Sequence, residues 1–241
     1  MLVEICANSY ESARNARLAG ADRIELCTEL GVGGITPSHG LVKKVTEELD
    51  IPVYVLIRPR SGSFCYDEAE LDIMKRDIEF CGEAGCAGIV SGVLTPGNVL
   101  DEDKTGKLVE ISGTMPFTFH RAFDWVSDPF ETTRRLAALG VKRILTSGQK
   151  SNAAEGLETL KALHEHGKGD PIIMPGGGIN PDNISDFAKH GFTEVHFSAT
   201  TFLQVLGKTP RISMNSLKFQ DETMVAYADK AKIEAIIKKI R

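Results

Sequence analysis

The sequence has 241 residues, of which 42% are hydrophobic and 25% are charged, and its formal net charge is −5. These values are typical of a soluble globular protein whose core needs no metal or disulfide for stability. The acidic balance argues against nucleic acid or an anionic membrane as a partner. No apolar stretch approaches the ~20 residues of a membrane helix, and the N-terminus lacks a signal-peptide pattern, so we expect a cytoplasmic protein.

Eight short apolar segments alternate with amphipathic stretches along the chain. The segments are 2–7, 22–27, 52–58, 87–92, 116–122, 142–148, 171–178 and 194–199. A helical pattern follows each of them, and the fourth helix, near 101–111, is short. Strands that alternate with helices pair in parallel through right-handed crossovers. The pattern therefore predicts an α/β fold with eight parallel strands.

Glycine and proline mark where these strands begin. Glycines precede the second, fourth, sixth and eighth strands, at Gly20, Gly85, Gly140 and Gly191. Prolines open the third, fifth and seventh strands, at Pro52, Pro116 and Pro171. Glycine just past a helix end adopts the left-handed conformation without steric cost, and proline is tolerated at the first residue of a strand.

Eight parallel strands in this length fit a closed barrel, which typically takes ~250 residues. We therefore predict one (β/α)₈ TIM-barrel domain over residues 1–241. The alternative is an open doubly wound sheet, which usually carries a GxGxxG turn after its first strand. The first strand here leads into ANSYES instead, so no nucleotide cofactor is predicted.

One segment interrupts the alternation. From Thr200 to about Asp221 the sequence shows no helix or strand period. Loops longer than ~15 residues usually serve a site or an interface, and the sequence does not say which applies here. We expect the last helix from about Glu222 to Arg241.

Polar side chains recur on one face of the predicted strands. Because strand side chains alternate, the apolar partners suit the outer helices and the polar set faces the barrel interior near its active-site end. This set contains Glu4, Cys6, Glu25, Cys27, Arg58, Thr118, His120, His196 and Ser198. An unpaired buried charge is costly, so we expect the charged and imidazole groups to neutralise one another in one cluster.

Three members of this set suit catalysis. Glu25 and His120 could transfer protons, and Arg58 could hold a carboxylate or phosphate by two hydrogen bonds. Arg60 either joins Arg58 or is a solvated loop charge. The alternative to a catalytic role is that each residue is a polar group at a strand end, which is solvated or whose hydrogen bonds are satisfied by its neighbours.

The seventh strand ends in MPGGGINPDN, which predicts an anion site. The glycines leave backbone N–H groups accessible, and a helix is expected from about Pro181. In barrels, phosphate usually binds the loops after strands seven and eight. The predicted anion ligands are Gly176, Gly177, Gly178 and Ser198. The alternative is a tight turn without a ligand.

Seven motifs in this order resemble the CutC copper homeostasis family: EICANS, GADRIELC, GGITPS, IRPR, FHRAFD, RILTSG and MPGGGI. The resemblance covers residues 1 to about 200. It implies a (β/α)₈ barrel, a cytoplasmic location, homo-oligomers and a role in copper tolerance. It also implies that Cys6 and Cys27 match two cysteines implicated in Cu(I) binding.

The thiol chemistry agrees with that implication. Cu(I) is a soft ion that favours thiolate ligands. Cys6 and Cys27 end neighbouring strands, which lie about 4.8 Å apart, so both sulfurs could reach one ion. Cys65 could add a third thiolate, whereas Cys81 and Cys86 suit packing. The alternative is that Cys6 and Cys27 are small apolar core residues.

Three functions remain open from the residues. The first is a cytoplasmic Cu(I)-binding protein that uses Cys6 and Cys27. The second is an enzyme that acts on a phosphorylated or anionic small molecule with Glu25, His120 and Arg58. The third is a divalent-metal enzyme with ligands among Glu4, Glu25, His120 and His196, since carboxylate and imidazole suit harder metals.

Overall fold

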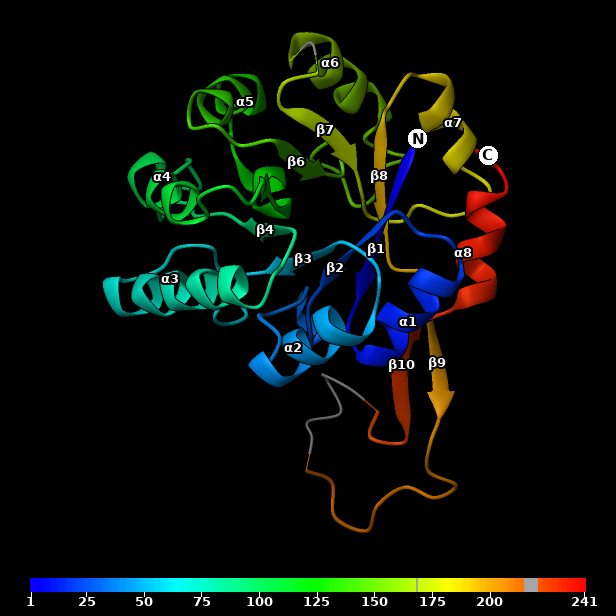
Figure 1. The fold of residues 1–241 in the computed structure, drawn as a ribbon. Coiled ribbons are helices and arrows are strands. Elements are labelled where there is room, and N and C mark those ends of the chain that lie inside the picture. The colour runs from blue at the N-terminus through cyan, green and yellow to red at the C-terminus, as the bar shows by residue number, and fades with distance from the viewer. Residues whose placement is uncertain (168, 215–220) are drawn as a thin grey trace.

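The computed structural model describes residues 1–167, 169–214 and 221–241. Eight strands alternate with helices along the chain, and these strands form the wall of the barrel (Figure 1). These strands are β1 (Leu2–Ala7), β2 (Arg23–Leu26), β3 (Val53–Leu56), β4 (Gly88–Ser91), β5 (Phe117–Phe119), β6 (Arg143–Thr146), β7 (Ile172–Pro175) and β8 (Glu194–Phe197). Each lies within a segment expected from the sequence.

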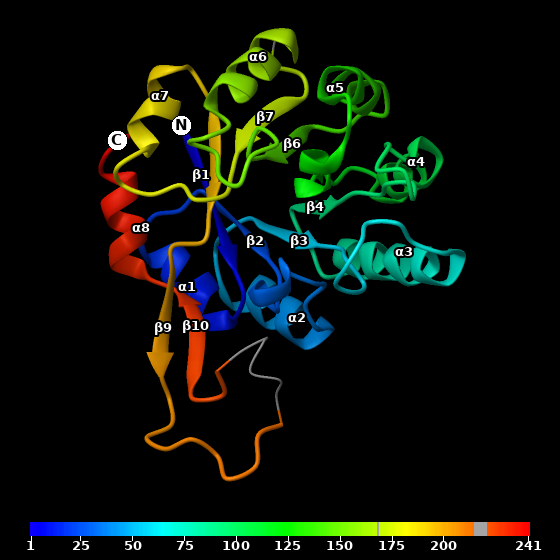
Figure 2. The same cartoon turned by 180° about the vertical axis from the view of Figure 1, so that it is seen from behind.

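The helices cover the outside of the strands, as the two opposite views show (Figures 1 and 2). They are α1 (Tyr10–Leu18), α2 (His39–Glu48), α3 (Glu68–Glu83), α4 (Glu102–Ile111), α5 (Pro129–Ala138), α6 (Leu157–Gly167), α7 (Ile184–Lys189) and α8 (Lys230–Ile237), with the short 3₁₀ helices η1 (Leu30–Val32) and η2 (Arg121–Trp125). No helix in the described ranges is long and apolar enough to cross a membrane.

All eight strands are parallel and follow the order of the chain around the barrel. The sheet runs from β7 back to β1 and then to β8. A parallel bridge between Gly176 and His196 joins its two ends. The (β/α)₈ barrel is therefore confirmed.

The glycines expected at helix ends adopt the predicted conformation. Gly20, Gly85, Gly140 and Gly191 have φ angles of +82°, +75°, +83° and +80°. Four successive helices, α2 to α5, begin after a residue whose side-chain oxygen accepts a backbone N–H of the first turn: Ser38, Asp67, Asp101 and Asp128. Such caps satisfy N–H groups that the helix cannot pair internally.

The apolar core lies between the strands and the helices. Every strand contributes at least one apolar side chain that is no more than 1% exposed: Ile5, Ile24, Val55, Ile89, Phe117, Ile144, Ile173 and Val195. Their polar neighbours, such as Glu4 and Glu25, occupy the other face and are also buried. The alternation read from the sequence therefore separates core from lumen correctly.

The C-terminal part differs from the expectation. The helix predicted from Glu222 is wrong in its first part: β9 (Thr200–Gln204) and β10 (Met224–Ala228) form an antiparallel hairpin, and α8 begins only at Lys230. The Asp229 side chain accepts the backbone N–H of Lys232 and caps α8. The hairpin lies at the side of the barrel (Figures 1 and 2). Part of the unassigned segment, 215–220, lies outside the described residues.

Candidate functional site

A small cavity of about 110 Å³ lies at the carboxyl ends of the strands. Many of its lining residues are members of the set expected to face the lumen: Cys6, Glu25, Cys27, Arg58, His120 and His196. The structure thus brings together side chains from strands or strand ends β1, β2, β3, β5 and β8. Active sites of TIM barrels lie at this end of the barrel.

Two thiols meet on one wall of the cavity. Cys6 lies opposite Glu25 in the β1–β2 register, and Cys27 follows two residues later on the same face. The two Sγ atoms are 3.6 Å apart. The hydrogen bond with Cys27 and burial raise the pKa of the Cys6 thiol well above its usual value.

His196 is held between two carboxylates. Its Nδ1 lies 2.7 Å from Oε1 of Glu4, and its Nε2 lies 3.3 Å from Oε2 of Glu25. Burial opposes the charged imidazole, but Glu25, a hydrogen bond with Cys6, and Glu4 raise its pKa well above the usual value. His196 is therefore a proton-carrying group beside the thiols.

The two carboxylates differ in their affinity for a proton. Burial disfavours ionisation of Glu4, but the hydrogen bond with His196 and the charge of Arg23 lower its pKa to about 2. Burial raises the pKa of Glu25 to about 7, and the charge of His196 opposes this only in part. Glu25 can therefore gain or lose a proton near neutral pH, whereas Glu4 stays ionised.

Below the cavity lies a charged network that the sequence analysis missed. The Arg23 guanidinium donates to both Glu4 and Glu194. Arg143 donates to Oε2 of Glu194 at 2.7 Å and thereby extends the network. Arg23 and Glu194 each stand two residues before a predicted lumen residue, so the same alternation could have identified them.

The expected mutual neutralisation of the cluster is wrong for Arg58. Its Nη1 donates to the carbonyls of Val32 and Gly34, both at 2.8 Å, and its Nη2 donates to Gly62 O at 2.9 Å. No ion pair with a described carboxylate is present. The loops after β2 and β3 turn their carbonyls toward the guanidinium, so dipoles replace the expected counter-ion. Arg60 pairs with Glu70 outside the cavity.

His120 is buried and neutral. Its Nδ1 accepts the backbone N–H of Ala122 at 3.3 Å, which places the proton on Nε2. Burial and the charge of Arg58 lower its pKa to about 3. The ring of Phe64 lies 4.7 Å from the His120 ring and 5.0 Å from the Arg58 guanidinium. Phe64 is a further residue that the sequence analysis missed, and no pattern in the sequence indicated it.

A larger cleft of about 670 Å³ adjoins the cavity, since Cys6, Arg121 and His196 line both. Gly177, Gly178, Ser198 and Lys232 also line this cleft. Gly177 and Gly178 have φ angles of +94° and +76°, which other residues rarely adopt. Three of the four predicted anion ligands therefore face one cleft.

Two details of the anion prediction need correction. Gly176 does not line the cleft: it bridges to His196, and a Cβ there would lie 2.4 Å from Leu145. The helix expected from Pro181 begins at Ile184 and has only six residues. The Asn180 side chain instead accepts backbone N–H groups of Asp182 and Asn183, which holds this segment in turns. The cations that line the cleft are Lys232 and Arg121, and Arg121 also pairs with Asp124 at 2.8 Å.

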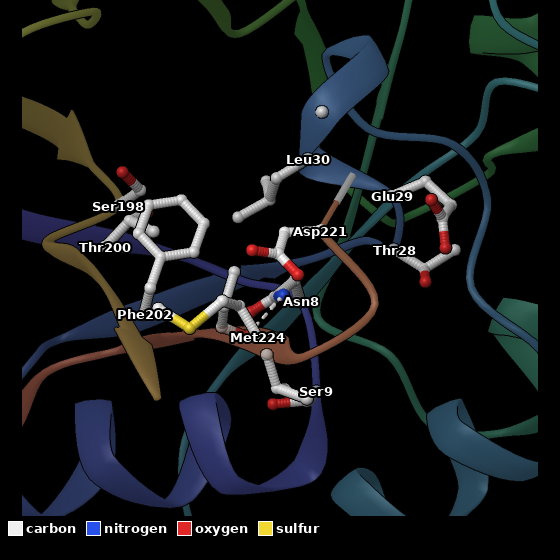
Figure 3. A pocket seen from close by; sticks show the side chains of 13 residues that line it. Asn8, Ser9, Thr28, Glu29, Leu30, Ser198, Thr200, Phe202, Asp221 and Met224 are labelled. Carbon is white, nitrogen blue, oxygen red and sulfur yellow. Dashed lines mark hydrogen bonds between the residues drawn. The ribbon is translucent and has the colours of Figure 1, made fainter. Parts of the chain in front are cut away.

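A third space, of about 630 Å³, lies between the loops after β1 and β2 and the hairpin. Figure 3 shows Phe202 and Met224 of the hairpin facing Leu30, with Asn8 and Asp221 between them. Asn8 donates to Ala226 O at 3.0 Å and so ties the hairpin to the barrel. Thr200 and Asp221, which bound the segment left unassigned by the sequence, both line this space.

Among the described residues, one group of side chains could hold a metal ion. It consists of Cys6, Glu25 and His196, whose ligand atoms lie within 4.8 Å of one another. Of the residues expected as ligands of a harder metal, Glu25 and His196 belong to this group, whereas Glu4 and His120 do not. Cys65 does not line the cavity, and the buried Cys81 and Cys86 belong to the apolar core.

The sequence of this chain is similar to those of proteins whose family is known. The CutC family model matches residues 1–201. A CutC family protein of Photorhabdus laumondii is 47% identical over 201 residues, which is 83% of this chain and 81% of the relative. The human copper homeostasis protein cutC homolog is 43% identical over 235 residues, covering 93% of this chain and 86% of the relative.

A solved structure agrees. The crystal structure of a copper homeostasis protein CutC from Streptococcus agalactiae superposes with a TM-score of 0.78 at 35% identity, covering 82% of this chain and 98% of the other. The extent of the family match, the identity to curated relatives and the shared barrel lead to one conclusion: the chain belongs to the CutC copper homeostasis family.

Proposed function

We propose that this protein is a cytoplasmic Cu(I)-binding protein whose metal ligands are Cys6 and Cys27. The observation that carries the proposal is the 3.6 Å separation of the two Sγ atoms at the barrel mouth. Thiolates are the ligands that Cu(I) favours, and the family's association with copper homeostasis supports the same ion.

The sulfur separation favours a bent site with a third ligand. Metal–sulfur bonds in proteins are about 2.3 Å long, so two sulfurs in a linear site would be about 4.6 Å apart. The two Sγ atoms here are closer, at 3.6 Å, so the S–Cu–S angle would be bent and a third ligand could approach the ion from the open side. His196 belongs to the same ligand group as Cys6, and because its Nδ1 faces Glu4, we propose its Nε2 as the third ligand.

The partners of His196 suit this role. In metal sites, a ligating histidine usually donates its other ring N–H to a carboxylate, as Nδ1 would to Glu4 at 2.7 Å. Nε2 must first lose its proton, and Glu25, with its pKa raised to about 7 by burial, lies 3.3 Å away to accept it. The chain therefore contains both the orienting carboxylate and the proton acceptor.

An anaerobic Cu(I) titration against a chromophoric chelator tests the proposal. We expect tight binding of one ion, at least a hundredfold weaker binding in Cys6→Ala/Cys27→Ala, and a smaller loss in His196→Gln. Cys81→Ala is the matched control, because it removes a buried thiol from the core rather than from the cavity. Unchanged affinity in the double variant would exclude this site.

A second candidate function is an enzyme that acts on an anionic small molecule. It is favoured by the presence in one cavity of a carboxyl group whose pKa is raised by burial to about 7 and a neutral imidazole that can donate from Nε2. Glu25 would transfer the proton, His120 would stabilise negative charge on a substrate oxygen, and Arg58 would hold the anion. The cleft at Gly177, Gly178 and Ser198 would hold a phosphate.

Hydrogen exchange tests this second function. Small carboxylic and phosphorylated acids are incubated with the protein in D₂O, and loss of carbon-bound proton signals is followed by NMR. We expect the wild type to exchange a carbon-bound proton for deuterium in at least one of these compounds. Glu25→Gln should exchange none. Glu70→Gln, which changes a carboxylate outside the cavity, is the control.

A further inference from the structure

Two buried N–H donors at the barrel mouth have no hydrogen-bond partner within the described ranges. They are Nε of Arg58 and Nε2 of His120. Arg58 and His120 are each only 5% exposed, and both line the 110 Å³ cavity. A buried donor without an acceptor costs free energy, so two such donors on residues that line one cavity point to an oxygen that they bind.

An anion is the acceptor that these two donors favour. The hydrogen-bond partners of Arg58 are carbonyl groups, which carry no net charge, so the guanidinium has no counter-ion among the described residues. His120 adds a neutral N–H donor, because its Nδ1 is already engaged by Ala122. A cation and a neutral donor that line one cavity match the two oxygens of a carboxylate.

The cavity also limits the size of the ligand. Its volume lies well below the roughly 300–1,000 Å³ of ordinary small-molecule sites. A larger ligand must therefore extend into the adjoining cleft, where Arg121, Lys232 and the glycines Gly177 and Gly178 can receive a second anionic group. The ligand would be an acid with negative charge at both ends.

We propose that Arg58 and His120 bind the carboxylate of a small organic acid, and that a phosphate at its other end lies in the cleft beside Gly177 and Ser198. This inference rests on the second of the two proposed functions, the enzyme, and assigns it a substrate class. The proposed ligands of the acid differ from those of Cu(I), although Arg58 and His120 line the same cavity as Cys6 and Cys27.

Calorimetric titration with three probes tests the assignment: glycolate, inorganic phosphate and 2-phosphoglycolate, which carries both groups. We expect 2-phosphoglycolate to bind at least tenfold more tightly than either of the others. His120→Leu should weaken it at least tenfold. His164→Leu is the matched control, because His164 also has a ring nitrogen without a described partner but lies on α6, away from the cavity.

A measurement on the unmodified protein removes any dependence on the folding of variants. The Nε2–H signal of His120 is followed by ¹H–¹⁵N NMR during titration with 2-phosphoglycolate, and we expect this signal to shift and saturate with the calorimetric Kd. An unmoved His120 signal, or equal affinity in His120→Leu and His164→Leu, would overturn the assignment. Binding does not require turnover, so saturable binding without proton exchange in D₂O would uphold this site while contradicting the enzyme function.

Discussion

Glu4 accepts from the guanidinium of Arg23 on one side and lies 2.7 Å from Nδ1 of His196 on the other. This carboxylate therefore connects the charged network inside the barrel to the thiol pair at its mouth. Its full burial means that neither cation can be compensated by water if the charge is removed. The same contact holds the imidazole ring with Nε2 toward Glu25.

The first prediction concerns this carboxylate. Glu4→Gln keeps the shape of the side chain but leaves Arg23 and His196 with one negative charge fewer. We expect the free energy of unfolding to fall by about 3 kcal/mol, as is typical when a buried pair loses one partner. Urea denaturation measures the change. Glu11→Gln removes an exposed pair with Arg14 and should alter stability by less than about 0.5 kcal/mol.

The second prediction is a pH dependence of stability caused by Glu25. Its pKa is raised from 4.5 to about 7 in the folded protein because burial disfavours the charged form. The folded state therefore retains a proton that the unfolded state has lost, and its stabilisation is complete below pH 4.5 and lost as pH rises through 7. The free energy of unfolding should fall by about 3 kcal/mol across this window.

Glu25→Gln should remove that slope. The comparison is best made between pH 4.5 and 6.5, because the raised pKa of His196 makes its own contribution fall only above its ordinary value of 6.5. Urea denaturation at half-unit steps provides the profile. Equal slopes for the wild type and Glu25→Gln would mean that Glu25 ionises normally in the folded protein.

Alternation along the strands was sufficient to predict much of the site from the sequence. Placing Val3 and Ile5 in the apolar layer placed Glu4 and Cys6 in the lumen, and the same reasoning applied to Glu25. The partners of Arg58 could not be predicted in this way. They are carbonyls of irregular loops, whose path depends on tertiary contacts and leaves no periodic signal.

The hairpin shows a second limit of prediction from the sequence. Met224–Ala228 is a five-residue strand directly before a helix, and its partner β9 lies about 20 residues earlier in the chain. A strand this short has too few alternations to be distinguished from a helical turn, and pairing across a long loop cannot be read from local sequence. The strand is fixed instead by contacts with α1, such as the bond from Ala228 N to Ser12 Oγ.

The third prediction concerns Gly177. An added Cβ at this position would lie 3.2 Å from Nη1 of Arg121, on the wall of the cleft. Gly177→Ala should weaken phosphate binding at least tenfold and, because φ is +94°, cost roughly 1–2 kcal/mol of stability. Gly85 also has a positive φ, of +75°, but open space around it, so Gly85→Ala should lose only stability. Phosphate titration and urea denaturation separate the two effects.

The fourth prediction concerns assembly, since the family resemblance implies homo-oligomers. The hairpin exposes Leu203 and Val225, which lie opposite each other in its register, and also Phe202, which is 64% exposed. Large exposed apolar side chains on one hairpin are typical of an interface. Leu203→Asp should therefore lower the molar mass measured by light scattering, whereas Val99→Asp, an exposed apolar residue outside the hairpin, should not. A monomeric wild type would contradict this expectation.

The fifth prediction is that Cu(I) affinity rises with pH. The Cys6 thiol holds its proton because the hydrogen bond with Cys27 and burial raise its pKa well above 9. A Cu(I) ion bound to this sulfur must displace that proton, and each displaced proton makes the apparent Kd fall about tenfold per pH unit. We therefore expect at least a tenfold gain in affinity between pH 7.5 and 8.5, a range above the pKa of Glu25. Chelator competition at the two pH values measures it, and Cys81→Ala should show the same dependence as the wild type. An affinity independent of pH would mean that Cys6 is not a ligand, and the metal site would then have to be sought elsewhere in the barrel.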